Sequence, residues 1–253
     1  MTATGNFSGK KALVFGGTSG IGLATVNQLK EQGAEVVAIS RDPSKAGDIA
    51  GVTLAACDVR DTDALSELLA QHAPFDLLIS AATGGSRAAG PFLQMDLAAY
   101  QASFDKLWGY TNIVRLGAEH LTEKGGIVLV SGAPARRAKP GQAALASVGG
   151  AVEQFARAVA PELAPRRINV VSPGVIDTPL ISQDIRSTLP SDGMWRLIPA
   201  EDIAKTVYRA YEEDKIHWYV PEDLEDLEKL VVEDPVKARD EVIRTGPMKM
   251  PIE

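Results

Sequence analysis

Apolar residues fall into short, nearly continuous runs that are separated by amphipathic segments. Six of these runs predict buried strands, over residues 12–16, 34–40, 52–59, 75–82, 125–132 and 167–174. Continuous apolar character is typical of parallel strands, because helices cover both faces of their sheet. Between the runs, apolar residues recur at three- and four-residue steps, as in helices that bury one face. The segment before the last strand shows this spacing at Val152, Phe155, Val159 and Leu163.

The alternation of strands and helices predicts an α/β fold of the Rossmann type, a doubly wound parallel sheet with helices on both faces. A chain of 253 residues can form a single domain of this kind, and no internal repeat or Pro-, Gly- or Ser-rich linker divides residues 1–253. Residues 221–253 are expected to form a charged, helical C-terminal extension. Its acidic residues read as a solvated face, with contact to a partner as the alternative.

The charge and cysteine content narrow the class of protein. A formal net charge of −7 argues against a nucleic-acid partner, which requires a concentrated basic surface. Cys57 is the single cysteine, so no disulfide can form within the chain, and we expect a buried thiol. The first residues lack the apolar core of a signal peptide, and no apolar run reaches the roughly 18 residues that suggest a membrane-spanning helix. We therefore expect a cytoplasmic protein without a membrane partner.

The first predicted strand runs directly into the sequence "GGTSGIG", in which Gly16, Gly20 and Gly22 have the spacing G-x-x-x-G-x-G. Glycine permits a positive φ in a tight turn and lets the backbone approach a pyrophosphate without a Cβ in the way. The helix that follows directs its free N–H groups at the phosphates. Between a first strand and a first helix, this spacing predicts a dinucleotide site, with a purely structural turn as the alternative.

The second predicted strand ends in Ser40, and Arg41 follows it. A carboxylate at this place would bind the ribose 2′-hydroxyl of NAD, whereas an arginine can bind the 2′-phosphate of NADP. The pattern therefore favours NADP(H) over NAD(H). The alternative is a surface arginine without a ligand.

With these residues, the chain resembles the short-chain dehydrogenase/reductase family over about residues 10–220. Asp58 and Val59 look like the family's adenine-side pair, and Arg167 and Asn169 precede a Pro-Gly pair as they do in the family. Residues 173–178 look like the segment that lines the nicotinamide, with Thr178 at the carboxamide. The resemblance implies a cofactor site formed by Gly16, Thr18, Ser19, Gly20, Ile21, Gly22, Ser40, Arg41, Asp58, Val59, Ala81, Ala82, Pro173, Gly174, Val175, Ile176 and Thr178.

The resemblance breaks at the residues that handle the proton. The family uses an asparagine, a serine that polarises the substrate carbonyl, a tyrosine that donates or accepts the proton, and a lysine that lowers the tyrosine pKa. Alignment from either side puts these four positions at Lys106, Gly132, Leu145 and Gly149. Between residues 111 and 218 the only tyrosines are Tyr208 and Tyr211, both beyond the Pro-Gly pair, so a shifted alignment does not restore the tetrad.

Lys106 and Tyr110 are the candidates to replace the missing acid. They lie four residues apart on a predicted helix and therefore on one face. A Tyr110 whose pKa is tuned by Lys106 can donate a proton. The alternative is that Tyr110 packs in the core or a subunit interface while Lys106 closes the vacated pocket.

Three cations follow the fifth predicted strand, Arg136, Arg137 and Lys139, in a loop that borders the substrate pocket in the family. They suggest an anionic small-molecule substrate with a carboxylate or phosphate, and the alternative is a solvated basic loop. The three histidines, His72, His120 and His217, have no ligand or triad spacing and read as structural, and we expect no metal.

Two classes of function follow from these patterns. The first is an NADP(H)-dependent oxidoreductase that acts on a small carbonyl or alcohol with a non-standard proton donor. The second is a catalytically inactive NADP(H)-binding sensor or partner subunit, and a lyase or isomerase on the same scaffold is a further alternative. The complete nicotinamide-side segment, which ends at Thr178, favours the first. The resemblance also implies a homodimer or homotetramer.

Overall fold

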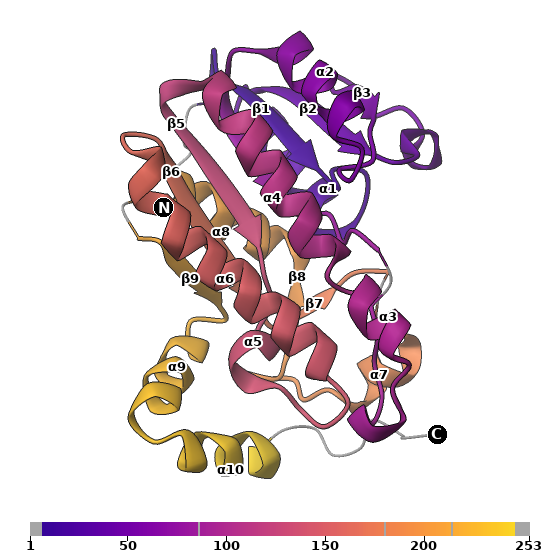
Figure 1. The fold of residues 1–253 in the computed structure, drawn as a ribbon, viewed down its shortest axis with the longest axis vertical. Helices are drawn as coiled ribbons and strands as arrows, with labels where there is room; N and C mark the ends of the chain where they lie inside the picture. Colours follow the sequence, from indigo (N-terminus) through magenta and orange to yellow (C-terminus); the bar gives the residue numbers. More distant parts are fainter. Residues whose placement is uncertain (1–6, 86, 180, 214, 246–253) are drawn as a thin grey trace.

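The computed structural model describes residues 7–85, 87–179, 181–213 and 215–245. Within these residues, seven parallel strands form one sheet in the order β3-β2-β1-β4-β5-β6-β9 (Figure 1). The strands are β1 (Lys11–Phe15), β2 (Glu35–Ser40), β3 (Thr53–Ala56), β4 (Phe75–Ser80), β5 (Leu121–Val130), β6 (Arg167–Pro173) and β9 (His217–Val220). The chain order reverses between β1 and β4, and a crevice opens at the carboxyl ends of strands at such a point.

Helices cover both faces of the sheet (Figure 1). On one face lie α1 (Gly20–Glu31) and α8 (Ala200–Glu212), and on the other lie α2 (Thr62–His72), α4 (Asp105–Gly117) and α6 (Ala143–Leu163). The shorter helices are α3 (Leu97–Ala102), α5 (Pro134–Arg137), α7 (Gln183–Thr188), α9 (Leu224–Glu233) and α10 (Pro235–Thr245), with 3₁₀ turns at Pro43–Ala46, Phe92–Gln94 and Ala118–His120. A small second sheet pairs β7 (Val175–Asp177) with β8 (Leu197–Pro199).

Strand β1 shows why its apolar run is continuous. Ala12 and Val14 pack in the cluster that includes α1 and α8, whereas Leu13 and Phe15 pack in the cluster that includes α2, α4 and α6. All four side chains are 0% exposed. Because successive strand residues point to opposite faces, both faces must supply apolar partners. The predicted doubly wound α/β fold is confirmed.

Strand β9 is absent from the sequence prediction. Its four residues, "HWYV", are all buried and pair with the outer edge of β6. The run is short and begins with a histidine, so it lacks the aliphatic signature of the other strands. Where α1 ends, Gly33 has a φ of +89° and its N–H bonds to Lys30 O, the conformation of a helix C′ residue.

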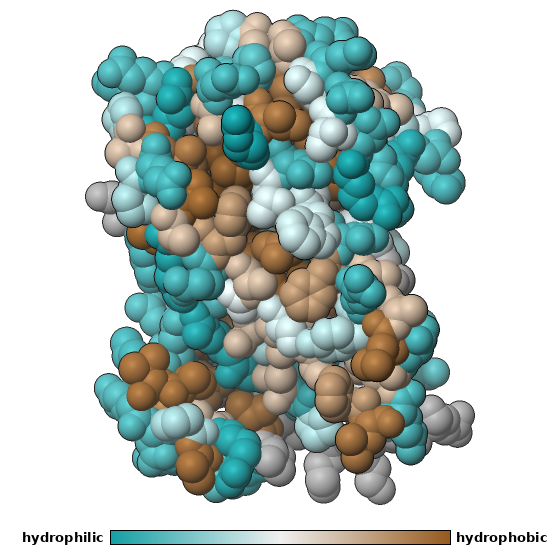
Figure 2. Space-filling model, in the orientation of Figure 1, coloured by the Kyte–Doolittle hydropathy of each residue, from teal (hydrophilic) through white to brown (hydrophobic). Residues whose placement is uncertain are grey.

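Within the predicted extension 221–253, α9 and α10 account for most of residues 224–245, and residues 246–253 lie outside the described residues. The apolar side of the two helices packs on Trp195 through Leu227, Ala238 and Val242. Val232 on α9 is 76% exposed. The space-filling view shows apolar residues gathered at the lower end of the molecule, where α9, α10 and α3 lie in Figure 1 (Figure 2). Across the described ranges, no helix combines the length and apolar character needed to cross a bilayer.

Candidate functional site

A cavity of about 1550 Å³ lies at the carboxyl ends of the sheet strands. It is bordered by Phe15 of β1, Ile39 of β2 and Val130 of β5. Every residue that the sequence predicted for the cofactor site lines it: Gly16, Thr18, Ser19, Gly20, Ile21, Gly22, Ser40, Arg41, Asp58, Val59, Ala81, Ala82, Pro173, Gly174, Val175, Ile176 and Thr178. The structure therefore brings predicted residues that are far apart in the sequence, from Gly16 to Thr178, into one cavity.

The backbone of the glycine loop is packed too closely for a Cβ at Gly16 or Gly22. Gly16 has a φ of +77°, and a Cβ added to it would lie 2.8 Å from the backbone N of Ala82. A Cβ on Gly22 would lie 2.1 Å from the carbonyl oxygen of Gly16. Helix α1 then begins at Gly20, and its N-cap residue Ser19 makes no side-chain capping bond. The first N–H groups of α1 are left to bind an anion.

The far end of the cavity carries Ser40 and Arg41. The Ser40 Oγ is buried and has no hydrogen-bond partner among the described residues, while Arg41 is exposed. Asp58 is held by Arg60, whose Nη2 lies 2.7 Å from Asp58 Oδ2. Hydrogen bonds from Arg60 lower the pKa of Asp58 to about 2, so this carboxylate is ionised at neutral pH.

The four positions that the resemblance assigns to the tetrad also meet at this cavity. Lys106, Gly132, Leu145 and Gly149 all line it. A Cβ added to Gly149 would lie 3.0 Å from Ala135 Cβ on α5 and 3.3 Å from Ser131 Oγ. Contacts this close force the neighbours to shift. Helix α5 therefore occupies the space where a longer side chain at position 149 would begin.

Lys106 on α4 brings an amine to the cavity. Its Nζ donates a hydrogen bond to Ser131 O at 3.2 Å. Burial and then the charge of Arg87 lower the pKa of Lys106 to about 8, with Glu153 acting in the opposite direction. The side chain is therefore mostly a cation at pH 7 but can lose its proton within the physiological range.

Tyr110 shares the face of α4 with Lys106, as the four-residue spacing predicted, and the Lys106 Nζ lies 5.4 Å from its ring centroid. Its hydroxyl, however, donates to Val130 O at 3.0 Å in the core, and the residue is 1% exposed. It does not line the described part of the cavity. Burial raises the pKa of Tyr110, which makes the phenol a poorer proton donor. The geometry thus matches the core-packing alternative for Tyr110.

A buried polar network that the sequence did not predict lies behind the cavity wall. Glu153 of α6 is 1% exposed and accepts hydrogen bonds from Ser172 Oγ at 2.8 Å and Ser131 Oγ at 3.3 Å. Ser172 Oγ also lies 2.7 Å from His217 Nε2. Arg136 Nε pairs with the other Glu153 oxygen at 3.0 Å. Position 153 follows Gly149 by four residues, so it lies one turn further along the same side of α6, and this spacing was the available signal.

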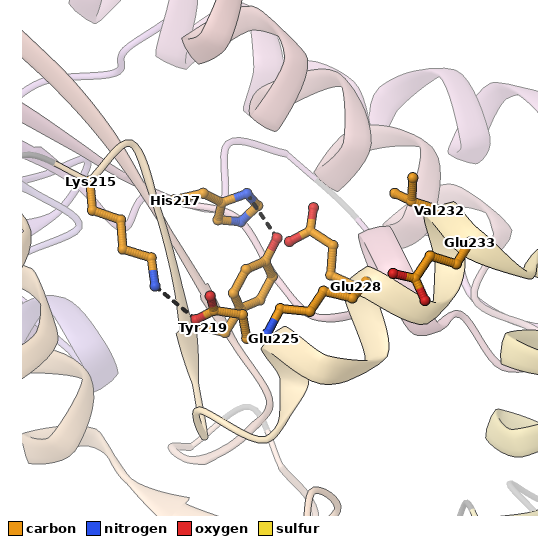
Figure 3. Close-up of a pocket in the computed structure, with 8 residues that line it drawn as sticks. Lys215, His217, Tyr219, Glu225, Glu228, Val232 and Glu233 are labelled. Carbon is orange, nitrogen blue, oxygen red and sulfur yellow. Dashed lines mark hydrogen bonds and ion pairs between the residues drawn. The ribbon is translucent and has the colours of Figure 1, made fainter.

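The network reaches a second, shallower groove of about 480 Å³ beside α9. Figure 3 shows His217 and Tyr219 meeting at this groove, with His217 Nδ1 3.1 Å from Tyr219 Oη. The groove is also lined by Glu225, Glu228 and Lys215. Since Ser131 lines the large cavity and His217 lines the groove, the hydrogen bonds join the two hollows. The other two histidines, His72 and His120, line neither.

Acid should destabilise the protein through His217. Burial, then the charges of Arg157 and Arg136, lower its pKa from 6.5 to about 3. Between these two pH values His217 is protonated in the unfolded chain and neutral in the folded chain. Stability is present above pH 6.5 and is lost as the pH falls toward 3. We expect the free energy of unfolding to fall by about 2 kcal/mol between pH 7 and pH 5 from this group. Burial raises the pKa of Glu153, which opposes part of the loss.

Urea unfolding of wild type and His217→Gln at both pH values measures this effect. The variant retains hydrogen-bonding groups but does not titrate, so its stability should change less between the two conditions. An equal change in both proteins would contradict the assignment to His217.

Known proteins resemble this chain over most of its length. Residues 16–207 match the family model described as Enoyl-(Acyl carrier protein) reductase. The L-xylulose reductase of Mus musculus is 33% identical over 183 residues, which cover 68% of this chain and 74% of that protein. A solved short chain dehydrogenase/reductase family protein is 29% identical, covers 85% of this chain and 96% of its own, and has a TM-score of 0.73.

A crystal structure of a small-chain dehydrogenase in complex with NADPH is 27% identical, with a TM-score of 0.71 and coverage of 83% of this chain and 95% of that chain. Among the residues that our structure describes, no three His, Cys, Asp or Glu side chains gather as a metal site would require. The chain belongs to the short-chain dehydrogenase/reductase family, as the matches, the sheet order and the glycine loop show together.

Proposed function

We propose that the protein is an NADP(H)-dependent oxidoreductase that reduces a small carbonyl compound, with Lys106 as the proton donor. The observation that carries this proposal is the meeting of the glycine loop, the nicotinamide-side residues 173–178 and Lys106 in one cavity. The similarity to an L-xylulose reductase supports a small carbonyl substrate, and the similarity to a dehydrogenase crystallised with NADPH supports the cofactor.

The residues of the cavity fit a phosphorylated dinucleotide. Gly16 and Gly22 allow a tight turn in which a Cβ at either position would meet backbone atoms, and α1 offers uncapped N–H groups beside that turn. At the other end, the orphaned Ser40 hydroxyl and the exposed Arg41 supply a donor and a positive charge for a 2′-phosphate. Thr178, 8% exposed, lies at the nicotinamide end in this assignment.

Removal of the Arg41 charge should change cofactor preference. We expect Arg41→Ala to weaken NADPH binding by about 10- to 150-fold, the range for one charge-assisted hydrogen bond, and to leave NADH binding unchanged. Fluorescence titration of both cofactors measures the two dissociation constants. Arg115→Ala is the matched control, because Arg115 is an exposed arginine outside the cavity. Equal weakening of NADPH and NADH by Arg41→Ala would refute a 2′-phosphate contact.

The proposed chemistry divides the reduction between cofactor and protein. When bound, NADPH would supply the hydride for the carbonyl carbon, and the protein would have to provide a proton for the carbonyl oxygen. The Lys106 Nζ is held at the cavity by its bond to Ser131 O and carries a proton that it can release, since its pKa is about 8. After transfer, the neutral amine takes a proton from solvent. Turnover should therefore decline as the pH rises above about 8, when the ammonium form is lost.

One observation favours a second candidate function, an NADP(H)-binding protein without turnover. Helix α5 fills the space at Gly149, and the side chains at Gly132 and Leu145 can neither donate nor accept a proton. A sensor or an inactive partner subunit needs no side chain at these positions that donates or accepts a proton.

The deciding experiment is a titration followed by turnover. NADPH binding is measured first by fluorescence, and NADPH oxidation is then followed with a panel of ketoses, aldehydes and diketones. Binding with turnover supports the reductase, and binding without turnover on every compound supports the second candidate. A protein that binds neither NADPH nor NADH would overturn both proposals.

A further inference from the structure

We propose that the substrate end of the cavity is an anion subsite, in which Arg137 and Lys139 hold a carboxylate or phosphate on the substrate. The inference rests on the proposed function in one respect, that the substrate carries a carbonyl group. Anion binding itself is independent of turnover.

Arg137 is a buried cation that forms no ion pair with any residue the structure describes. Although it borders the cavity, the side chain is only 3% exposed. Its Nη1 donates to Met194 O at 3.0 Å, while its Nε is buried with no hydrogen-bond partner among the described residues. Within those residues it forms no ion pair, and Asp223, the carboxylate whose charge it senses, pairs with Arg196 at 3.5 Å. A charge taken out of water in this way is costly unless an anion compensates it.

Trp195 holds two cations together at this place. The Arg137 Cζ lies 3.9 Å from the Trp195 ring centroid, and the Lys139 Nζ lies 4.4 Å from it. Burial and the neighbouring Arg137 charge lower the pKa of Lys139 to about 8. The two cations on one indole concentrate positive charge at this side of the cavity, and such a concentration attracts an anion. The indole is itself fixed by Leu227 and Ala238 of the C-terminal helices.

The charges around the cavity support the same ligand class. Away from the Ser40 and Arg41 end, where Asp42 and Asp58 lie, the described lining of the cavity includes four cations and one carboxylate: Arg87, Lys106, Arg137, Lys139 and Asp184. The whole chain has a formal net charge of −7, so this basic wall is not a consequence of composition. A concave site with one sign of charge attracts ligands of the other sign.

The position of Arg137 relates the anion to the proposed reaction. A Cβ on Gly174 would lie 3.0 Å from Arg137 Nη2, so the guanidinium borders the segment assigned to the nicotinamide. An anion held there lies close to the carbonyl that would receive the hydride. The geometry therefore points to a short substrate, a keto acid or a phosphorylated ketone, rather than to a neutral sugar.

The test uses the full chain saturated with NADPH and measures binding calorimetrically. The probes are pyruvate for a carboxylate, dihydroxyacetone phosphate for a phosphate ester, inorganic phosphate, and neutral dihydroxyacetone. We expect at least one anionic probe to bind more tightly than dihydroxyacetone, and Arg137→Met to weaken that probe by about 10- to 150-fold. Tight binding of pyruvate alone assigns a carboxylate, and tight binding of the phosphate probes assigns a phosphate.

Arg136→Met is the matched control, because Arg136 lies on the same short helix but pairs with Glu153 and Glu228 and does not line the cavity. Lys139→Met provides a second variant in case Arg137→Met does not fold, and it should weaken the same probe at least threefold. Equal binding of neutral and anionic probes, or no loss in either cavity variant, would overturn the subsite.

The outcomes separate this inference from the proposed function. Reduction of a neutral carbonyl without Arg137-dependent anion binding leaves the reductase proposal intact and removes the subsite. Arg137-dependent anion binding without turnover of any carbonyl leaves the subsite intact and removes the reductase.

Discussion

Gly16→Ala is expected to lower the free energy of unfolding by about 3 kcal/mol and to weaken NADPH binding at least 100-fold. Part of the loss is the strain of a non-glycine residue at positive φ, about 1 kcal/mol. The remainder comes from crowding, since the new Cβ would lie 2.8 Å from Ala82 N and 2.9 Å from Ala81 C, both backbone atoms directly after β4. The loop must move, and the N–H groups at the start of α1, which we propose bind the phosphates, move with it.

Gly9→Ala is the matched control for this variant. Gly9 has a φ of +78°, nearly the value of Gly16, but no atom lies within 4 Å of its added Cβ. It should therefore show the strain alone, about 1 kcal/mol, with NADPH affinity unchanged. Urea unfolding with and without NADPH measures both quantities. Equal losses in the two variants would mean that the close approach at Gly16 has no energetic importance.

Lys106→Met is expected to lower kcat for carbonyl reduction by about 10²- to 10⁴-fold, the usual contribution of a positioned acid, while the NADPH dissociation constant stays the same. Methionine is uncharged, so the substitution leaves no unpaired charge in the fold, and the variant should remain folded. Steady-state kinetics from pH 6 to pH 10 are the measurement. Loss of the decline above about pH 8 in the residual activity would connect that decline to the Lys106 ammonium.

Two further variants sharpen the Lys106 test. Lys106→Arg keeps the positive charge but holds its proton too tightly to donate it, so it should be as inactive as Lys106→Met. Tyr110→Phe removes a hydroxyl that bonds to Val130 O in the core, and its turnover should be unchanged. Full activity in Lys106→Met, or its loss in Tyr110→Phe, would reverse the assignment.

The sequence was sufficient to predict the fold and to predict which residues meet around the glycine loop, because both depend on local patterns. Continuous apolar runs follow directly from a sheet that helices cover on both faces, and the glycine spacing follows from backbone contacts within one turn. The helical period likewise placed Lys106 and Tyr110 on one face of α4. It could not determine that Tyr110 Oη ends at Val130 O while Lys106 Nζ reaches the cavity, because that depends on the distance to the sheet.

The unpredicted features depend on contacts between distant segments. Glu153, Ser172 and His217 come from α6, β6 and β9, and no local pattern connects a helix carboxylate to a strand histidine 64 residues later. The position of α5 against Gly149 is a tertiary contact of the same kind. Strand β9 was missed because its four residues become a strand only when β6 offers an edge.

The packing of Trp195 against Leu227, Ala238 and Val242 has a consequence for biosynthesis. A ribosome releases the glycine loop early, whereas the Trp195 indole gains its contacts with Leu227, Ala238 and Val242 when the last helices have emerged. Domains fold as their segments become available. A nascent chain that stalls before α9 would therefore carry the segment of the glycine loop next to an incomplete wall of the cavity, and the proposed anion subsite would be the last part to form.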